Sequence, residues 1–160
     1  MSNSSSKDVH VPLHLRIDAT RQILEVFRGG KVSKSYPIST SKFGFGFEPG
    51  SNKTPLGRFV VSEKIGAGAA AGAVFKSRVP TGEIACQGGH EDLVLTRILW
   101  LAGIDETNAN TKERYIYIHG TNQEALLGTP ASHGCVRMSN ADIAECFGEI
   151  PEGTLVEIVT

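Results

Sequence analysis

The sequence predicts a mainly β, single-domain protein with one short helix. Its 160 residues match the length of one domain. Its 18 glycines are about 11% of the chain, against a usual value of about 7%, which favours many turns and tight backbone approaches. Several segments also alternate apolar and polar residues with a period of two, as half-buried strands do.

The N-terminal third predicts an antiparallel meander. Leu13, Leu15 and Ile17 alternate with polar residues, so this segment reads as a half-buried strand. Residues 23–27 and 31–38 continue the pattern on either side of the Gly29-Gly30 pair, which is a hairpin turn signal.

The remaining elements follow from the same patterns. Ser139 or Asn140 is placed to cap a short helix that runs to Phe147. A loop is expected over 39–53, and a flexible N-terminus over 1–10 precedes a folded domain over 11–160. Further strands are predicted at residues 59–65, 73–77, 93–101, 115–119 and 155–159.

Charge and hydropathy argue against two classes of partner. The chain has 16 basic and 17 acidic side chains, so no general field attracts nucleic acid or an anionic membrane surface. Its most apolar stretch, residues 93–104, is shorter than the roughly 20 residues that span a bilayer. We therefore expect neither a nucleic-acid partner nor a membrane partner.

Cysteine usage and the N-terminus indicate a compartment. Cys86, Cys135 and Cys146 are an odd and sparse set, which is more usual where thiols stay reduced. The first residues lack the basic start and apolar run of a secretory signal. We expect a cytoplasmic protein; the alternative is a periplasmic one whose signal is missing from this sequence.

The segment with most chemical content is His119-Gly120-Thr121 followed by Ser132-His133-Gly134-Cys135-Val136-Arg137. A thiol beside an imidazole is the arrangement that activates a cysteine nucleophile, and neighbouring glycines let a carbonyl approach backbone N–H groups. This pattern points to acyl transfer. The alternative is that the cysteine is a small buried hydrophobe and the histidines are satisfied loop residues.

The Ser-His-Gly-Cys-Val-Arg block after a histidine strand resembles the signature of the L,D-transpeptidase (YkuD-type) catalytic domain. Residues 54–59, Thr-Pro-Leu-Gly-Arg-Phe, and residues 115–121 are similar to two further segments of that family. The resemblance runs from about Leu13 to Val159. It implies a compact β-sandwich or barrel-like domain with a short helix near the catalytic loop, acting on peptidoglycan stem peptides without a cofactor or metal.

The same resemblance implies roles for three residues. Cys135 corresponds to the nucleophile, and His119 to the general base that later protonates the leaving amine. As the base, His119 is expected to hold the pKa of Cys135 below the value of about 8.5 of a free thiol. No acidic residue lies near His119 in the sequence, and the family can orient this histidine with a backbone carbonyl, so Gly120 is the candidate partner.

Four loop residues complete the candidate site. We expect His133 to be structural or to line the substrate rather than to act as base, and Ser132 to brace the loop. The N–H groups of Gly134 and Cys135 are the expected oxyanion donors. Arg137 is expected either to bind a substrate carboxylate through its forked guanidinium or to pin the loop to backbone carbonyls.

Other notable residues have simpler readings. Cys86 and His90 form at most half a metal site, so we predict no metal. Cys146 and Trp100 read as core residues. Phe43, Phe45 and Phe47 alternate with other residues in a glycine-rich loop and favour core packing over an aromatic wall on a cleft lid.

Three functions fit the sequence. The first is a cytoplasmic L,D-carboxypeptidase that trims the terminal D-alanine from recycled tetrapeptide muropeptides. The second is an exported L,D-transpeptidase that forms 3–3 cross-links or anchors proteins to the wall. The third, a non-catalytic wall-binding module, is least favoured because Cys135 and His119 are both present. The resemblance also implies that a carbapenem acylates Cys135.

Overall fold

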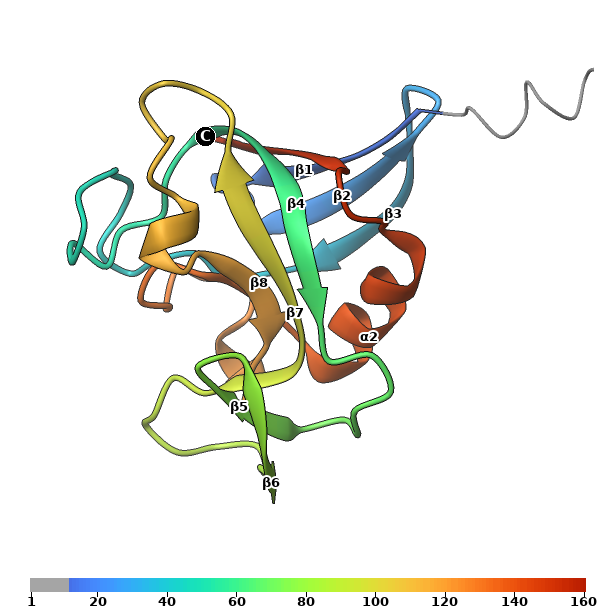
Figure 1. Ribbon diagram of the computed structural model, residues 1–160, viewed down its shortest axis with the longest axis vertical. Helices are drawn as coiled ribbons and strands as arrows, with labels where there is room; N and C mark the ends of the chain where they lie inside the picture. Colours follow the sequence, from blue (N-terminus) through green and yellow to red (C-terminus); the bar gives the residue numbers. More distant parts are fainter. Residues whose placement is uncertain (1–11) are drawn as a thin grey trace, which may run out of the picture.

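The computed structural model describes residues 12–160, and the predicted flexible segment 1–10 lies outside this range. Its strands form one ten-stranded sheet (Figure 1). The strands are β1 (Leu13–Asp18), β2 (Ile23–Arg28), β3 (Lys31–Pro37), β4 (Gly57–Ile65), β5 (Ala73–Lys76), β6 (Val79–Ile84), β7 (Val94–Gly103), β8 (Tyr117–Gly120), β9 (Val136–Met138) and β10 (Leu155–Val159). The helices are α2 (Asn140–Glu149) and the 3-10 turns η1 (Lys112–Arg114) and η2 (Glu124–Leu126).

The predicted meander is present. β1 and β2 pair antiparallel, as do β2 and β3. The Gly29-Gly30 pair forms the turn that joins β2 to β3. β1 also pairs in parallel with the C-terminal strand β10, which is antiparallel to β4. The two ends of the described chain therefore lie side by side in the sheet.

The long strand β7 is the branch point of the sheet. β4 and β5 pair with different parts of β7, and β8 pairs with it as well. β8 then pairs in parallel with β9. Ser39, just after β3, exchanges two backbone hydrogen bonds with Arg137 of β9 at 3.0 and 2.9 Å. This bridge links the end of β3, one edge of the sheet, to β9, the end of the branch through β8, so the sheet curls into the barrel-like form that the family resemblance implies.

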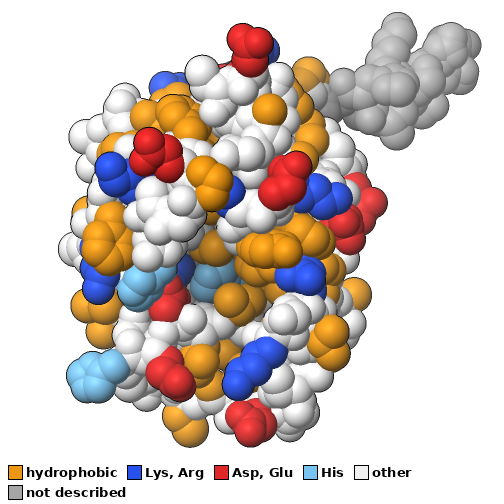
Figure 2. All heavy atoms as spheres, turned by 60° about the vertical axis from the view of Figure 1, so that its left-hand side comes forward, with side chains coloured by type: hydrophobic (Ala, Val, Ile, Leu, Met, Phe, Trp, Pro, Cys, Tyr) orange, Lys and Arg blue, Asp and Glu red, His pale blue; other side chains and the backbone are white. Residues whose placement is uncertain are grey.

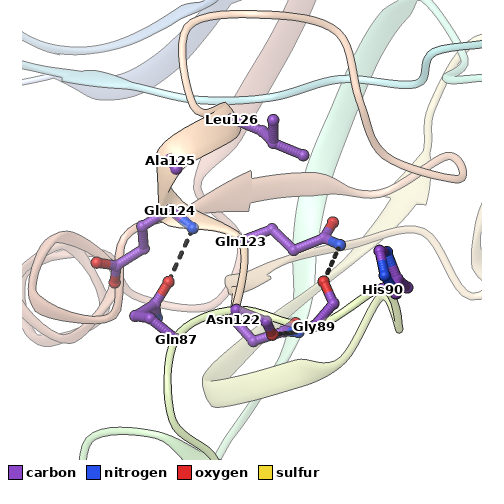
Figure 3. Close-up of a pocket in the computed structure, with 9 residues that line it drawn as sticks. Gln87, Gly89, His90, Asn122, Gln123, Glu124, Ala125 and Leu126 are labelled. Carbon is purple, nitrogen blue, oxygen red and sulfur yellow. Dashed lines mark hydrogen bonds between the residues drawn. The ribbon is translucent and has the colours of Figure 1, made fainter.

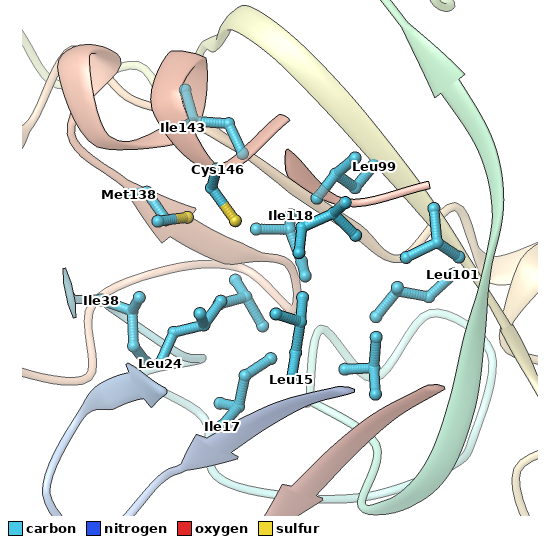
Figure 4. Close-up of a cluster of buried hydrophobic side chains, with 14 of the residues drawn as sticks. Leu15, Ile17, Leu24, Ile38, Leu99, Leu101, Ile118, Met138, Ile143 and Cys146 are labelled. Carbon is cyan, nitrogen blue, oxygen red and sulfur yellow. The ribbon is translucent and has the colours of Figure 1, made fainter. Parts of the chain in front are cut away.

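The main core fills the inside of this curled sheet (Figure 4). Ser139 caps α2, its side chain accepting a hydrogen bond from Asp142 N at 3.0 Å. The helix lays Ile143 and Cys146 onto the core, so the prediction that Cys146 is a core residue is confirmed. Representative members from the strands are Leu15, Ile17, Leu24, Leu99, Leu101, Ile118 and Met138.

A second apolar cluster lies where the β5–β6 hairpin packs against β7 and β8. Phe75 of the hairpin belongs to this cluster with Ile98 and Tyr117, and Trp100 and Cys135 are packed against it while only partly buried. Trp100 is therefore not part of the main core, contrary to the sequence prediction. The alternation along β7 sends Leu99 and Leu101 inward and Trp100 to the opposite side.

The loop before β4 does not use its aromatic residues as core. Phe43 is 46% exposed and Phe45 is 38% exposed, so the expected core packing is wrong for these two side chains. The loop is held by polar contacts instead, among them Thr54 Oγ1, which accepts a hydrogen bond from Ser41 N at 3.0 Å. Within residues 12–160, no helix is long and apolar enough to cross a membrane.

Candidate active site

The β8–β9 ladder sorts its side chains between two faces. Ile118 pairs with Val136, and both face the main core. His119 pairs with Arg137, so these two point the other way. Cys135 directly precedes β9 and shares the second cluster with Tyr117, two residues before His119. Cys135 and His119 therefore lie on the same outer face of neighbouring strands, and the residue that pairs with His119, Arg137, is two residues after Cys135.

The Cys135 thiol is held by the backbone of two tyrosines. The Tyr117 N–H donates to Sγ at 3.2 Å, and Sγ is placed to donate to the Tyr115 carbonyl at 3.4 Å. Burial raises the pKa of Cys135 to about 12. The expectation of a lowered pKa is therefore wrong for this arrangement, because desolvation outweighs the nearby positive charges. At neutral pH the Cys135 side chain is therefore a thiol rather than a thiolate.

His119 is buried and its ring orientation is fixed. Nδ1 lies 2.6 Å from the Gly120 carbonyl oxygen, which can only accept, so Nδ1 carries the proton and Nε2 keeps its lone pair. Burial lowers the pKa of His119 below its usual value, so the ring is neutral at pH 7. Among the described residues, no hydrogen bond joins His119 to Cys135. Such bonds often form only when substrate is bound.

Asp92 is an acidic residue at this site that the sequence analysis missed. Its Oδ2 lies 2.9 Å from His133 Nδ1, and its Oδ1 accepts from Arg137 Nη1 at 3.1 Å. Burial pushes the pKa of Asp92 up, but its basic neighbours, His119 first among them, bring it below the ordinary value. Its negative charge in turn raises the pKa of His119 against the effect of burial. Asp92 is 41 residues before His133 in the chain, so no local pattern pointed to it.

Arg137 takes neither of its two expected roles. Its side chain is fully buried and donates to Asp92 and, at 2.7 Å, to Gln123 Oε1. The guanidinium therefore has no surface with which to meet a substrate carboxylate, and it donates to side chains rather than to backbone carbonyls. Nε and Nη2 are buried without a hydrogen-bond partner. Arg137 instead anchors the Asp92 carboxylate beneath the site.

The loop before Cys135 is cross-braced. Ser132 Oγ donates to the Cys135 carbonyl at 2.7 Å and accepts from Gly134 N at 3.2 Å. Thr54 Oγ1 donates to the Gly134 carbonyl at 3.0 Å, and Gly134 has a φ of 127°, which favours glycine. Because the Gly134 N–H already has a partner, its use as an oxyanion donor requires that bond to open. That role remains a prediction.

Two cavities flank these residues. One, of about 280 Å³, is lined by Asn52, Tyr115 and His133, and His133 lies there beside the exposed ring of Phe43. The other, of about 530 Å³, lies between residues 87–90 and 122–126, whose side chains tie the two loops together (Figure 3). On the side that faces left in Figure 1, histidine and hydrophobic side chains gather in a hollow ringed by charged groups (Figure 2).

Cys86 and His90, the other predicted residues, are not among the hydrogen-bond partners of the thiol. Cys86 is exposed and unpaired, in the loop that also carries His90 at the rim of the larger cavity. Over residues 12–160, no three His, Cys, Asp or Glu side chains come close enough together to hold a metal ion.

These features define a barrel-like β domain with a cysteine and a histidine on one face. Comparison with known proteins gives the family: residues 12–158 match the L,D-transpeptidase catalytic domain, YkuD. The chain belongs to this family.

Individual relatives are distant. The chain is 26% identical over 148 residues to the Bacillus subtilis protein YkuD, which carries a provisional L,D-transpeptidase name, covering 92% of this chain and 66% of that protein. Another B. subtilis protein with such a name, YqjB, is 32% identical over 84% of this chain and 64% of its own length. The chain spans less than two thirds of the length of these relatives.

Solved structures share the fold. An L,D-transpeptidase from Mycobacterium smegmatis superposes with a TM-score of 0.63 at 18% identity, covering 94% of this chain and 59% of that one. L,D-transpeptidase 3 from Mycobacterium tuberculosis, solved with a faropenem-derived adduct, gives 0.60 at 16% identity, covering 94% and 61%. At these identities the superpositions establish the fold alone.

Proposed function

We propose that the protein is a cysteine L,D-carboxypeptidase. It would cleave the bond between the L centre of the third stem residue, a diamino acid, and the terminal D-alanine. The observation that carries this proposal is the shared outer face of β8 and β9. It holds the Cys135 thiol between two tyrosine backbones and, one step away, a neutral His119 whose Nδ1 is fixed by Gly120.

The proposed reaction begins with a neutral pair. Sγ of Cys135 attacks the scissile carbonyl carbon while its proton passes to Nε2 of His119, so the thiolate forms only during attack. The tetrahedral intermediate collapses, the C–N bond breaks, and the His119 proton goes to the amine of the departing D-alanine. A thioester to Cys135 remains.

Water then resolves the thioester. His119 takes a proton from the water as its oxygen attacks the carbonyl, and the C–S bond breaks with return of that proton to sulfur. Water is present at about 55 M and needs no aligned binding site, whereas an acceptor amine must be held in place to compete. Hydrolysis is therefore the expected default, and the tripeptide is the product.

We further propose a cytoplasmic role in muropeptide recycling. The three cysteines are all unpaired, as is usual in a reducing compartment. Soluble turnover fragments gain nothing evident from cross-linking. In the wall, by contrast, neighbouring stems supply a high effective concentration of acceptor amine.

An exported L,D-transpeptidase is the second candidate. The names of the relatives favour it, and this chain matches only about two thirds of the length of those relatives. Because structures of relatives carry imipenem and a faropenem-derived adduct, we expect a carbapenem to acylate Cys135 under either function.

Product analysis distinguishes the two functions. Purified protein is incubated with a disaccharide tetrapeptide, with and without a second D-amino acid as acceptor, and the products are resolved by mass spectrometry. The carboxypeptidase gives tripeptide and free D-alanine as the dominant products in both reactions. Dominant 3–3 linked dimers or D-amino-acid exchange would instead assign the protein to the transpeptidases. The Cys135→Ala variant is the control for contaminating activity.

A further inference from the structure

A further basic group, Arg78, is connected to the thiol through Tyr117 and lies at the tip of the β5–β6 hairpin. Ser77 and Arg78 form the two-residue turn between Lys76 and Val79, and both have positive φ, 49° and 66°. Glycine or asparagine usually occupies such positions because a β-carbon is strained there. The turn therefore holds Arg78 in one place over the outer face of β7 and β8.

The Arg78 guanidinium lies on an aromatic platform. Its Cζ is 4.8 Å from the Trp100 ring centroid and 5.0 Å from that of Tyr115, and Nη1 donates to the Tyr117 hydroxyl at 3.0 Å. In the part of the chain that the structure describes, no carboxylate lies within ion-pair distance of it. Stacking uses the face of the guanidinium and leaves N–H groups at its edge for a planar acceptor.

Lys112 shows that this lack of an acidic partner is particular to Arg78. Its Nζ lies over the same Trp100 ring, 5.0 Å from the centroid, but it is also 2.9 Å from Glu63 Oε2. One of the two cations on Trp100 is thus neutralised within the protein and the other is not. A carboxylate of a bound ligand would give Arg78 its ion-pair partner.

The platform is built from the residues that hold the nucleophile. The carbonyl of Tyr115 and the N–H of Tyr117 contact Cys135 Sγ, while the rings of the same two residues contact Arg78. The guanidinium is thus separated from the thiol by the length of one tyrosine. When the scissile carbonyl of a substrate lies at Sγ, the substrate group that reaches the guanidinium is about one tyrosine length away from that carbonyl.

The two residues that the scissile bond joins carry two candidate carboxylates. The carboxylate of the terminal D-alanine is separated from the scissile carbonyl only by the amide nitrogen and one carbon, which is too short for this distance. The carboxylate at the far end of a diaminopimelate side chain is separated by the whole side chain, a length comparable to a tyrosine. Lysine has no carboxylate there.

We propose that Arg78 binds the side-chain carboxylate of the third stem residue and so makes the enzyme selective for diaminopimelate over lysine. This inference rests on the proposed action at that residue. An Arg-carboxylate pair beside aromatic rings is charge-assisted and bidentate, which is the strong form of the interaction.

Three tetrapeptides that differ only at residue three test this proposal: diaminopimelate, diaminopimelate amidated at the side-chain carboxyl, and lysine. For the wild-type protein, we expect kcat/KM for the acid to exceed that for the amide and for lysine by about 10- to 100-fold. In Arg78→Gln the acid-to-amide ratio falls to about one. Lys112→Gln, which removes the other cation from Trp100, keeps the wild-type ratio.

The outcomes separate this inference from the proposed function. If the wild-type protein releases no D-alanine from any of the three peptides, the proposed function fails. If it releases D-alanine but shows no acid preference, or if Arg78→Gln keeps the preference, the role of Arg78 is wrong. Arg78→Lys keeps the charge but loses the fork and gives an intermediate ratio, which preserves the test should the glutamine variant not fold.

Discussion

The two faces of the β8–β9 ladder are built by different means. On the inner face, Ile118, Val136 and Met138 are fully buried among apolar neighbours. On the outer face, His119 and Arg137 are equally buried, but their partners are polar: the Gly120 carbonyl for His119, and the Asp92 and Gln123 side chains for Arg137. The comparison teaches that strand alternation places the reactive groups, while loops from elsewhere in the chain set their charge and orientation.

The largest expected effect distinguishes Cys135, on the outer face, from Cys146, in the main core. Cys135→Ala should abolish D-alanine release, because every covalent step needs Sγ, while leaving the unfolding midpoint nearly unchanged since the side chain is only partly buried. Cys146→Ala should do the reverse: it keeps turnover and loses about 1 kcal/mol of stability from a core contact. A D-alanine assay and urea unfolding measure the two effects.

Cys86→Ala is the control for both variants, because this exposed thiol belongs to neither face. It should match the wild-type protein in turnover and in unfolding. If it or Cys146→Ala is folded but inactive, the assignment of Cys135 as the nucleophile is wrong.

A smaller effect compares the stability that a buried apolar side chain, Met138, and a buried charged one, Arg137, each contribute. Met138→Ala on the inner face should lower the free energy of unfolding by about 3 kcal/mol through a cavity. Arg137→Met on the outer face should cost about as much for another reason, because it leaves the Asp92 carboxylate without its buried partner. Adding Asp92→Asn to Arg137→Met should therefore recover part of the loss. Urea unfolding of the single and double variants checks this, and strictly additive losses would contradict the coupling.

The inner and outer faces also differ in how much of their structure the sequence predicted. Period-two alternation predicted the β1–β3 meander and the inner face of the sheet, and the cap at Ser139 predicted α2. The strands β6 and β9 were missed, because β6 is exposed throughout and β9 has only three residues. Trp100 was misplaced because its hydrophobicity was weighed above its position in the alternation of β7.

For the candidate site, the chain-local signature named Cys135, His119 and Gly120. The structure brings Cys135 and His119 to one face, and the Gly120 carbonyl orients the His119 ring. Asp92 and Arg78 had no such signal. Each reaches the site through a loop or hairpin whose position depends on tertiary packing, tens of residues from the signature. The raised pKa of Cys135 was also beyond the sequence, since desolvation depends on what covers the thiol.

The smallest expected effect tests the coupling of Asp92 to His119. The proposed mechanism needs neutral His119, so kcat/KM should fall on the acid side as the ring is protonated. Burial lowers the pKa of His119, which places this acid limb below pH 6.5, and the Asp92 charge partly opposes the shift. Asp92→Asn removes the opposing charge and leaves Arg137⁺, which also lowers the pKa, so the acid limb should move to lower pH.

Asp105→Asn is the matched control for this last comparison, because it also breaks an arginine pair, with Arg58, but on an exposed part of β4 away from the thiol. Its acid limb should coincide with that of the wild-type protein in kcat/KM profiles measured over the same buffers. A general loss of stability would shift both variants alike, whereas coupling to the base shifts only Asp92→Asn. An acid limb that moves to higher pH in Asp92→Asn would show that the carboxylate acts on another group, and an unmoved limb would show that His119 is not the titrating base.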